Sequence, residues 1–378
     1  MNHANGSELI AQIEVSTNKA IILKFEATEE STYRILSSAN LLTNTTSWPS
    51  VTNILGSNGI VSVRIPIQTI NMYYAIEERK RLLYGSTFYV DTNSDAQLWV
   101  YRNIISKPSE AALMQKVAGG GASLWLTSKE SDTKITVAKR IQEAYVADQI
   151  PVFTLYNIIK RDCSSYSTGG ASNAEIYTNW VHKIAEGIGS NRLAIVILEP
   201  DSLAGFDCPL LTPTQRIERL NLLKTAVDIL KSDTRALVYM DGGHSNWKSV
   251  SEMAGLLKRA GVEKSDGFAL NVSNFQFDYN LVKYGSSISK LLGDMHFVID
   301  SSRNGRGPYI NPNDPEYWCN PPGRALGSPP TTDTKHPLID AYLWIKVPGE
   351  SDGTCRGGPP AGIFWPEYAI GLAERASY

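Results

Sequence analysis

Two carboxylates follow an apolar run in the stretch AIVILEPDSLAG, which extends from Ala194 to Gly205. The run is continuous and rich in β-branched residues, which is typical of a strand covered on both faces of a parallel sheet. Glu199 and Asp201 come directly after it. Parallel α/β folds carry their chemistry at the carboxyl ends of the strands, so both side chains are candidates for it. The alternative is that Asp201 caps a following helix.

The same arrangement recurs along the chain, because polar side chains follow one apolar run after another. They are Tyr156, Arg161 and Asp162; Glu199 and Asp201; Asp241, His244 and Trp247; Asn271 and Asn274; Asp300, Arg303 and Arg306; and Lys346, Glu350 and Asp352. One such ending could be a helix cap. Repetition at successive strands is typical of a barrel active site.

The residue types in this set narrow the chemistry. Carboxylates dominate, and no Ser or Cys nucleophile with a paired His is apparent. His244 has no second His four residues on, which favours hydrogen bonding to a substrate or a neighbour over metal binding. Glycosidic cleavage needs one protonated carboxyl and one ionised carboxylate, and aromatic faces suit sugars. We therefore expect a sugar substrate, with no metal and no cofactor.

The chain has two regions with different patterns of apolar and polar residues, and the candidate side chains lie in the second. Residues 1–82 hold short alternating runs separated by polar, Gly-rich and Asn-rich turns, which predicts a small all-β sandwich domain. Residues 83–378 alternate strand, loop and helix, which predicts an α/β catalytic domain. Eight candidate strands, from TFYVD to AYLWIKVP, favour a distorted parallel (β/α) barrel of the TIM-like kind, with seven or eight strands.

Composition excludes several classes of partner. The 378 residues include 36 basic and 38 acidic side chains, so nothing favours nucleic acid or an anionic membrane. No apolar run approaches the roughly 18 residues of a membrane span. No signal peptide is visible, so either it was removed or the protein is intracellular. An even number of cysteines fits two disulfides in an oxidising compartment, with four buried thiols as the alternative: Cys163, Cys208, Cys319 and Cys355.

Several motifs together carry a family resemblance. YNIIKRDC, ILEPDSLAG, YMDGGHSNW, ALNVSNF, VIDSSRNGRGP, YWCNPPGRALG and LWIKVPGESDGTCRGGP occur in this order. From about Phe88 to the C-terminus the chain resembles glycoside hydrolase family 6, the endoglucanases and cellobiohydrolases that cleave β-1,4-glucans. NIIK departs from the family pattern, so the resemblance does not imply the conformation of the loop before Arg161. Residues 1–82 loosely resemble, by general pattern only, the fibronectin-like modules of secreted bacterial enzymes.

The resemblance implies a catalytic role for five residues. Family members invert the anomeric centre, and Asp201 matches the general acid. Asp162 matches the aspartate that supplies a neighbouring charge and helps to organise the attacking water. Asp352 matches a debated general base, with a water chain to Asp162 as the alternative. Asp241 is implied to bind substrate or support the acid, with a helix cap as its alternative, and Tyr156 to favour a distorted sugar ring.

Substrate contacts and disulfides are also implied by the resemblance. The expected substrate-binding residues are Trp125, His244, Trp247, Asn274, Trp318, Lys346 and Glu350. Cys163 is expected to pair with Cys208, and Cys319 with Cys355, which favours a secreted protein. Three other tryptophans, Trp99, Trp180 and Trp344, are expected in the core.

The loops decide between internal and end-directed cleavage. The segments from Arg303 to Cys319 and after Asp352 are short, which favours an open cleft and hence an inverting endo-β-1,4-glucanase. Its partner would be a β-1,4-glucan, with no nucleic acid or membrane, and the protein a monomer. The alternatives are a cellobiohydrolase, an inactive glycan-binding protein, which would lack an essential carboxylate, and a metal-dependent enzyme using Glu199, Asp201 and Asp241.

Overall fold

The chain divides into two compact units in the computed structural model, which describes residues 12–16, 20–67 and 72–378. The first unit comprises Met1–Tyr84 with Lys335–Asp340. The second comprises Gly85–Thr334 with Ala341–Tyr378. All the side chains that the sequence singles out for chemistry belong to the second unit.

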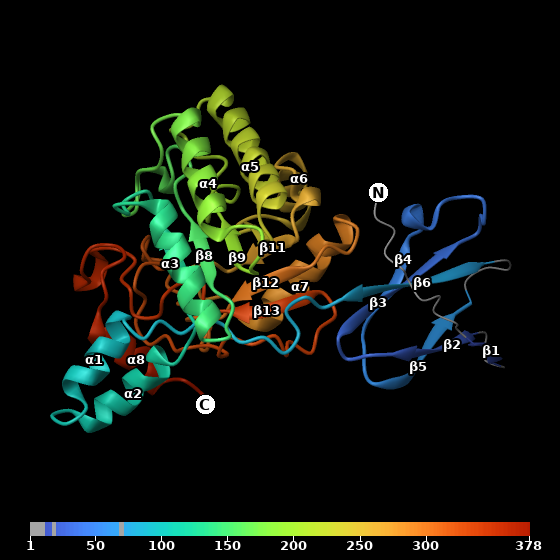
Figure 1. Ribbon diagram of the computed structural model, residues 1–378, viewed down its shortest axis with the longest axis horizontal. Coiled ribbons are helices and arrows are strands. Elements are labelled where there is room, and N and C mark those ends of the chain that lie inside the picture. Colours follow the sequence, from blue (N-terminus) through green and yellow to red (C-terminus); the bar gives the residue numbers. More distant parts are fainter. Residues whose placement is uncertain (1–11, 17–19, 68–71) are drawn as a thin grey trace. The chain divides into compact units, whose positions relative to one another are not determined.

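Two small antiparallel sheets form the first unit (Figure 1). Their strands, in sheet order, are β1 (Gln12–Ser16), β2 (Ala20–Ala27) and β5 (Gly59–Pro66), then β4 (Ser50–Leu55), β3 (Ser31–Ser38) and β6 (Tyr73–Lys80). Both sheets contribute to one apolar cluster, in which the rings of Phe25 and Tyr33 lie 5.0 Å apart. The sequence predicts β2, β3, β5 and β6. It misses β4, because none of its residues is buried and no apolar face marks it.

One seven-stranded sheet forms the centre of the second unit. In sheet order its strands are β13 (Ile339–Leu343), β12 (Phe297–Asp300), β11 (Gly267–Leu270), β10 (Leu237–Asp241), β9 (Ile195–Leu198), β8 (Val152–Leu155) and β7 (Leu124–Leu126). The strands from β7 to β12 pair in parallel. Every residue of β8 to β12 is buried, as expected for a sheet covered on both faces.

The sheet curls so that its two edges meet. Ala122, just before β7, forms a parallel bridge with Trp344, just after β13, and Ser123 N donates to Trp344 O at 2.9 Å. The indole of Trp125 donates to Ile345 O at 2.8 Å. The expected distorted barrel is therefore confirmed, with seven strands. The candidate strand TFYVD contributes only an isolated bridge between Phe88 and Ile150.

Helices lie outside this sheet, and Figure 1 shows α3, α4 and α5 side by side. They are α1 (Asp95–Asn103), α2 (Pro108–Ala118), α3 (Thr133–Val146), α4 (Ala174–Ile188), α5 (Pro213–Asp233), α6 (Val250–Arg259), α7 (Asp278–Leu291) and α8 (Pro366–Glu374). Local sequence sets their starts, as in α5, where Thr212 and Gln215 form a capping box and Pro213 occupies the first turn. No helix in the described part of the chain is long and apolar enough to cross a membrane.

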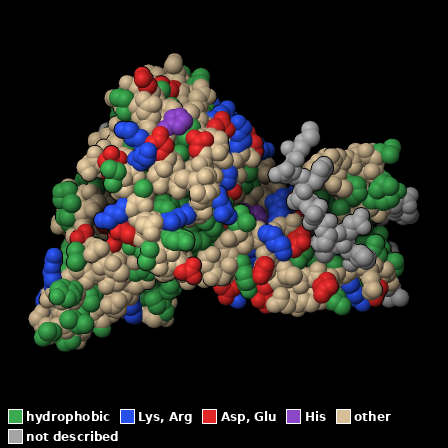
Figure 2. Space-filling model, viewed as in Figure 1, with side chains coloured by type: hydrophobic (Ala, Val, Ile, Leu, Met, Phe, Trp, Pro, Cys, Tyr) green, Lys and Arg blue, Asp and Glu red, His purple; other side chains and the backbone are tan. Residues whose placement is uncertain are grey.

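Charges of both signs are interspersed on the face shown in Figure 2. The end of α1 instead presents apolar side chains to solvent: Tyr101 is 83% and Ile105 94% exposed. Because positive and negative side chains are interspersed on the face in Figure 2, that face has no electrostatic field of a single sign that would attract a polyanion.

Candidate active site

A cavity of about 600 Å³ lies at the carboxyl ends of the strands. Eleven of the twelve expected catalytic and substrate-binding residues line it: Trp125, Tyr156, Asp162, Asp201, His244, Trp247, Asn274, Trp318, Lys346, Glu350 and Asp352. Asp241 does not line the cavity, because it is buried behind Asp201 at the end of β10. The loops after six different strands thus converge on one site, as in barrel enzymes.

Asp201, in the cavity wall, and Asp241, buried behind it, form an interacting pair of carboxyls. The backbone N–H of Asp201 donates to Asp241 Oδ2 at 2.9 Å, and Gly243 N donates to the same oxygen at 3.2 Å. Burial, then the neighbouring charges of Asp241 and Asp162, raise the pKa of Asp201 well above its usual value. Burial also raises the pKa of Asp241 to about 7. Asp201 is therefore built to keep a proton near neutral pH.

Glu199 points away from the cavity and organises the neighbouring loop. Its carboxyl is fully buried and accepts the backbone N–H groups of Asn157 at 2.9 Å and Ile158 at 2.8 Å. Burial raises its pKa to about 7. Glu199 and Asp201 both have left-handed backbone conformations, with φ of 50° and 66°, so the chain after β9 turns one carboxyl inward and the other toward the cavity.

Asp162 and Tyr156 lie on the loop that Glu199 holds. Asp162 Oδ2 accepts the N–H of Ser167 at 2.5 Å, and burial raises the pKa of the carboxyl above its usual value. Burial together with the charges of Asp201 and Asp162 raises the pKa of Tyr156 well above its usual value. The guanidinium of Arg161 lies 4.9 Å from the centre of the Tyr156 ring. Tyr156 and Asp162 thus face the same space as Asp201.

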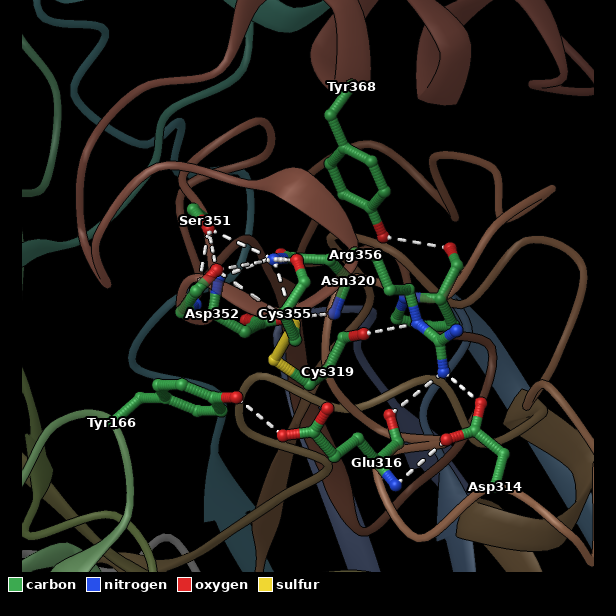
Figure 3. The surroundings of a disulfide bond; sticks show 12 residues. Tyr166, Asp314, Glu316, Cys319, Asn320, Ser351, Asp352, Cys355, Arg356 and Tyr368 are labelled. Carbon is green, nitrogen blue, oxygen red and sulfur yellow. Dashed lines mark hydrogen bonds and ion pairs between the residues drawn. A yellow bond between two sulfur atoms is a disulfide. The ribbon is translucent and has the colours of Figure 1, made fainter.

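Asp352 is held by ion pairs and by hydrogen bonds with Asn320, and Figure 3 shows the latter. The Nη1 of Arg303 lies 2.9 Å from Oδ1 and 3.0 Å from Oδ2, and Asn320 N donates to Oδ2 at 3.0 Å. The Nζ of Lys346 lies 3.8 Å from Oδ1. Since Arg303 is completely buried, Asp352 is its counter-charge.

Two further residues tie the loops of the site together. Asp300, at the end of β12, accepts backbone N–H groups from Ser273, Ser302 and Lys346 at 2.9–3.0 Å, so it joins the loops after β11, β12 and β13. Arg219, on α5, lines the cavity and donates to carbonyl groups in the loops after β8 and β9, among them Ser202 O at 3.1 Å and Lys160 O at 2.9 Å. Its position within an ordinary helical pattern gave no sign of this role.

Aromatic and cationic groups form one end of the cavity. The rings of Trp125 and Tyr156 meet edge to face, 5.2 Å apart. The Nζ of Lys346 lies 6.0 Å from the Trp125 ring centre and 3.8 Å from Glu350 Oε2. Burial raises the pKa of Glu350 above its usual value. An apolar face beside paired charges offers a sugar both stacking and hydrogen-bonding groups.

His244, Trp247 and Asn274 line the cavity from the loops after β10 and β11. Burial lowers the pKa of His244 to about 4, so the ring is neutral near pH 7. Its Nδ1 accepts the N–H of Asn246 at 3.3 Å, which leaves the proton on Nε2 for donation. Trp247 is 44% exposed and its ring lies 5.5 Å from that of His244.

The structure also tests the predictions for the cysteines and for three tryptophans. The two disulfides join Cys163 to Cys208 and Cys319 to Cys355, as the family resemblance implied. Trp180 and Trp344 are buried, and Trp99 is partly buried and packs against the core. Within the described residues no group of three or more His, Cys, Asp and Glu could hold a metal ion.

This arrangement defines a class of protein: an α/β-barrel enzyme whose site is built from partly buried carboxylates and aromatic faces. A sequence profile described as glycosyl hydrolases family 6 matches residues 83–376. The chain belongs to glycosyl hydrolase family 6.

Relatives at 36–40% identity are endoglucanases by name, and others at 28–29% identity are cellobiohydrolases by name. Endoglucanase A of Cellulomonas fimi is 40% identical over 297 residues, covering 78% of this chain and 62% of the relative. Endoglucanase A of Thermobispora bispora is 38% identical over 303 residues, covering 78% and 63%. The chain thus spans less than two thirds of the length of both relatives.

One similar solved structure contains a sugar ligand. The endoglucanase Cel6 from Mycobacterium tuberculosis, in complex with methyl-cellobiosyl-4-deoxy-4-thio-β-D-cellobioside, is 46% identical to this chain. The two superpose with a TM-score of 0.72, over 78% of this chain and 99% of that one.

Proposed function

We propose that this protein is an endo-β-1,4-glucanase that hydrolyses cellulose and related glucans with inversion at the anomeric carbon. The observation that carries the proposal is the carboxyl of Asp201, which faces a cavity lined with tryptophans and whose pKa is raised by desolvation and by the charge of Asp241. Glycosidases need a carboxyl that is still protonated when the leaving oxygen must receive a proton. The names of the endoglucanase relatives support the same activity.

Asp201 acts as the general acid in this proposal. Its carboxyl protonates the departing glycosidic oxygen, while Asp241 disfavours the ionised form of the acid before the bond breaks. Oδ1 of Asp241 is buried and has no hydrogen-bond partner among the described residues. If Asp241 were ionised, this oxygen would carry negative charge without a partner. Asp201 and Asp241 together therefore favour keeping a proton.

The better supported general base is Asp162, which receives the proton through a chain of water molecules. Inversion requires a water on the opposite face of the sugar from the acid. Asp162 lines the cavity, accepts one backbone N–H from Ser167, and has a pKa raised by burial, which makes it a stronger proton acceptor than a solvated aspartate. Both oxygens of Asp352 already accept from Arg303. Asp352 then orients the relay through its fixed charge.

Substrate is held by the groups on either side of these carboxylates. Trp125, Lys346 and Glu350 bind one part of the glucan. The loops after β10, β11 and β12 bind the other part, with His244, Trp247, Asn274 and Trp318. Tyr156 crowds the sugar beside the scissile bond and favours a distorted ring, a contribution of about 1–5 kcal/mol.

Internal cleavage is favoured by the fold of the segment after Asp352. This segment folds back on itself, because Ser351 N donates to Ile363 O and Trp365 N to Gly349 O at 2.9 and 2.8 Å. It therefore adds no long lobe over the cleft before α8. A cellobiohydrolase is the second candidate, since Tyr166 and Glu316 make a contact between loops at the cavity mouth.

The rest of the proposal concerns the whole chain. Residues 1–82 would be an accessory module of the fibronectin-like kind and residues 83–378 the catalytic domain. The protein would be a secreted monomer that acts without a cofactor, and its partner is a β-1,4-glucan rather than nucleic acid or a membrane. The two disulfides support an oxidising compartment.

Paired measurements on carboxymethylcellulose test this function. An endo-acting enzyme lowers the viscosity steeply while few reducing ends appear, and NMR of the first products should show the α-anomer. Slow viscosity loss with cellobiose as the main product would favour the cellobiohydrolase. No hydrolysis of any β-1,4-glucan would overturn the proposal and leave a glycan-binding protein.

A further inference from the structure

Two loops on opposite sides of the cavity are joined by a hydrogen bond. Tyr166 lies between β8 and α4, and Glu316 lies between β12 and β13. Three strands separate β8 from β12 in the sheet order. The hydroxyl of Tyr166 nevertheless donates to Glu316 Oε1 at 2.5 Å (Figure 3). Tyr166 and Trp318 both line the cavity and Tyr166 is 39% exposed, so this bond joins two loops of the cavity wall where they meet solvent.

Glu316 is presented by a braced segment. Arg356 donates to the carbonyl oxygens of Glu316 at 3.1 Å and Cys319 at 2.9 Å, and it pairs with Asp314 (Figure 3). The disulfide between Cys319 and Cys355 joins the same two segments. The acceptor for Tyr166 therefore belongs to a rigid part of the site.

The Tyr166 ring packs against Trp318 and Gly353. It lies 6.2 Å from the ring of Trp318. A Cβ on Gly353 would come within 2.3 Å of Tyr166 Cγ, so only glycine fits there while the ring keeps this position. Gly353 follows Asp352, and the ring thus covers the backbone beside the ion-paired carboxylate.

Tyr166 is also tied to the position of Asp162. The next residue, Ser167, donates its N–H to Asp162 Oδ2 at 2.5 Å, and its carbonyl accepts from Arg161 Nε at 2.9 Å. A backbone bridge between Arg161 and Gly169 closes the loop into one small unit. A change at Tyr166 therefore reaches the Asp162 carboxylate through a single residue.

We infer that Tyr166 and Glu316 form a clasp that sets how substrate enters the cleft and holds the Asp162 loop for catalysis. This inference rests on the proposed glucanase function. An internal stretch of glucan has no end to thread, so the clasp must open for it to enter. Once closed again, the clasp positions Asp162 and its water. Tyr166 is thus a positioning residue that also determines specificity.

The variant Tyr166→Phe removes only the hydroxyl and tests both parts of the inference. On carboxymethylcellulose, viscosity loss per new reducing end should rise, because the cleft opens more readily. On cellotetraose, kcat should fall on the order of tenfold as Asp162 loses its support, given the strength of a hydrogen bond to a charged group. Glu316→Gln keeps an acceptor oxygen and should stay closer to the wild type. Tyr101→Phe, on exposed α1, is the matched control and should change neither quantity.

Hydrogen–deuterium exchange of the full chain measures the clasp without substrate. Tyr166→Phe should speed exchange in residues 162–170 and leave α1 unchanged. If the wild type cleaves β-1,4-glucans but Tyr166→Phe changes neither the exchange rates nor the cleavage pattern, the clasp alone is overturned. Equal losses on both substrates with a lowered melting temperature would also overturn it, in favour of a purely structural tyrosine. A wild-type chain inactive on every β-1,4-glucan would overturn the proposed function and the clasp's role in substrate entry together.

Discussion

The backbone amide of Asp201 donates to the carboxylate of Asp241 at 2.9 Å. This bond fixes the start of the loop after β9 against the end of β10, so the Asp201 carboxyl is placed by the very residue whose charge raises its pKa. Asp241 is buried, whereas Asp201 is partly buried where it lines the cavity. Asp241 therefore acts on Asp201 in two ways, through the hydrogen bond that positions it and, after burial, through the charge that raises its pKa, and mutation can test the two effects separately.

Replacing the acid tests the first role. Asp201→Asn should keep the fold and lower kcat on cellulose about 10²–10⁴-fold, the usual contribution of a general acid. An aryl cellobioside with an acidic leaving group needs less protonation, so its loss should be much smaller. Asp228→Asn, on the exposed face of α5, is the matched control. A variant that turns over cellulose at a near-normal rate would exclude Asp201 as the acid.

Removing the neighbouring charge should shift the pH profile. In the proposed mechanism the alkaline limb of kcat/KM follows loss of the proton from Asp201, whose pKa is raised by burial and then by the charge of Asp241. Asp241→Asn keeps an oxygen for the Asp201 amide but removes the charge, so the pKa of Asp201 falls and the limb moves to lower pH. The profile on cellotetraose measures this. An unmoved limb would mean that Asp241 only positions the loop.

The ion pair between Asp352 and Arg303 should matter for stability. Asp352→Ala leaves a fully buried guanidinium without its counter-charge, which costs about 3–5 kcal/mol in the free energy of unfolding. The exposed pair of Lys264 and Asp228 is the comparison, and Asp228→Ala should cost at most about 1 kcal/mol. Denaturant unfolding gives both values. Arg303→Met combined with Asp352→Ala should recover part of the loss, and equal costs for Asp352→Ala and Asp228→Ala would refute the buried pair.

Much of the second unit could be predicted because each strand leaves two signals in the sequence. A buried strand needs a continuous apolar run, and the polar residues just after it mark the carboxyl edge of the sheet. Both signals are present at β9 and β10, and Asp201, Asp241 and His244 lie where the pattern puts them. The resemblance supplied what the pattern could not, namely the disulfide pairs.

Other features depend on geometry that residue types do not encode. Glu199 and Asp201 are the same kind of side chain two positions apart, and only the left-handed turns after β9 send them in different directions. Tyr166 and Glu316 are 150 residues apart, so nothing local links them. Arg219 reads as an ordinary helical residue, although its guanidinium binds two loops of the site.

The inward carboxyl of Glu199 gives a pH dependence of stability. Its pKa is about 7 in the folded protein, against 4.5 for an ordinary glutamate, so the folded state binds the proton more tightly than the unfolded state. Between pH 4.5 and 7 the folded state therefore holds more protons, and the free energy of unfolding falls as the pH rises, by about 3 kcal/mol for this group. Above pH 7 its contribution levels off.

Glu199→Gln isolates that contribution. The amide oxygen still accepts from Asn157 and Ile158, but the side chain no longer titrates. Denaturant unfolding at pH 4.5 and pH 7 should show a smaller drop for the variant than for the wild type, while the other buried carboxyls titrate in both. The difference between the two drops is the quantity to compare with about 3 kcal/mol. Equal drops would mean that Glu199 is already ionised at pH 4.5, held by the two backbone amides rather than neutralised by burial.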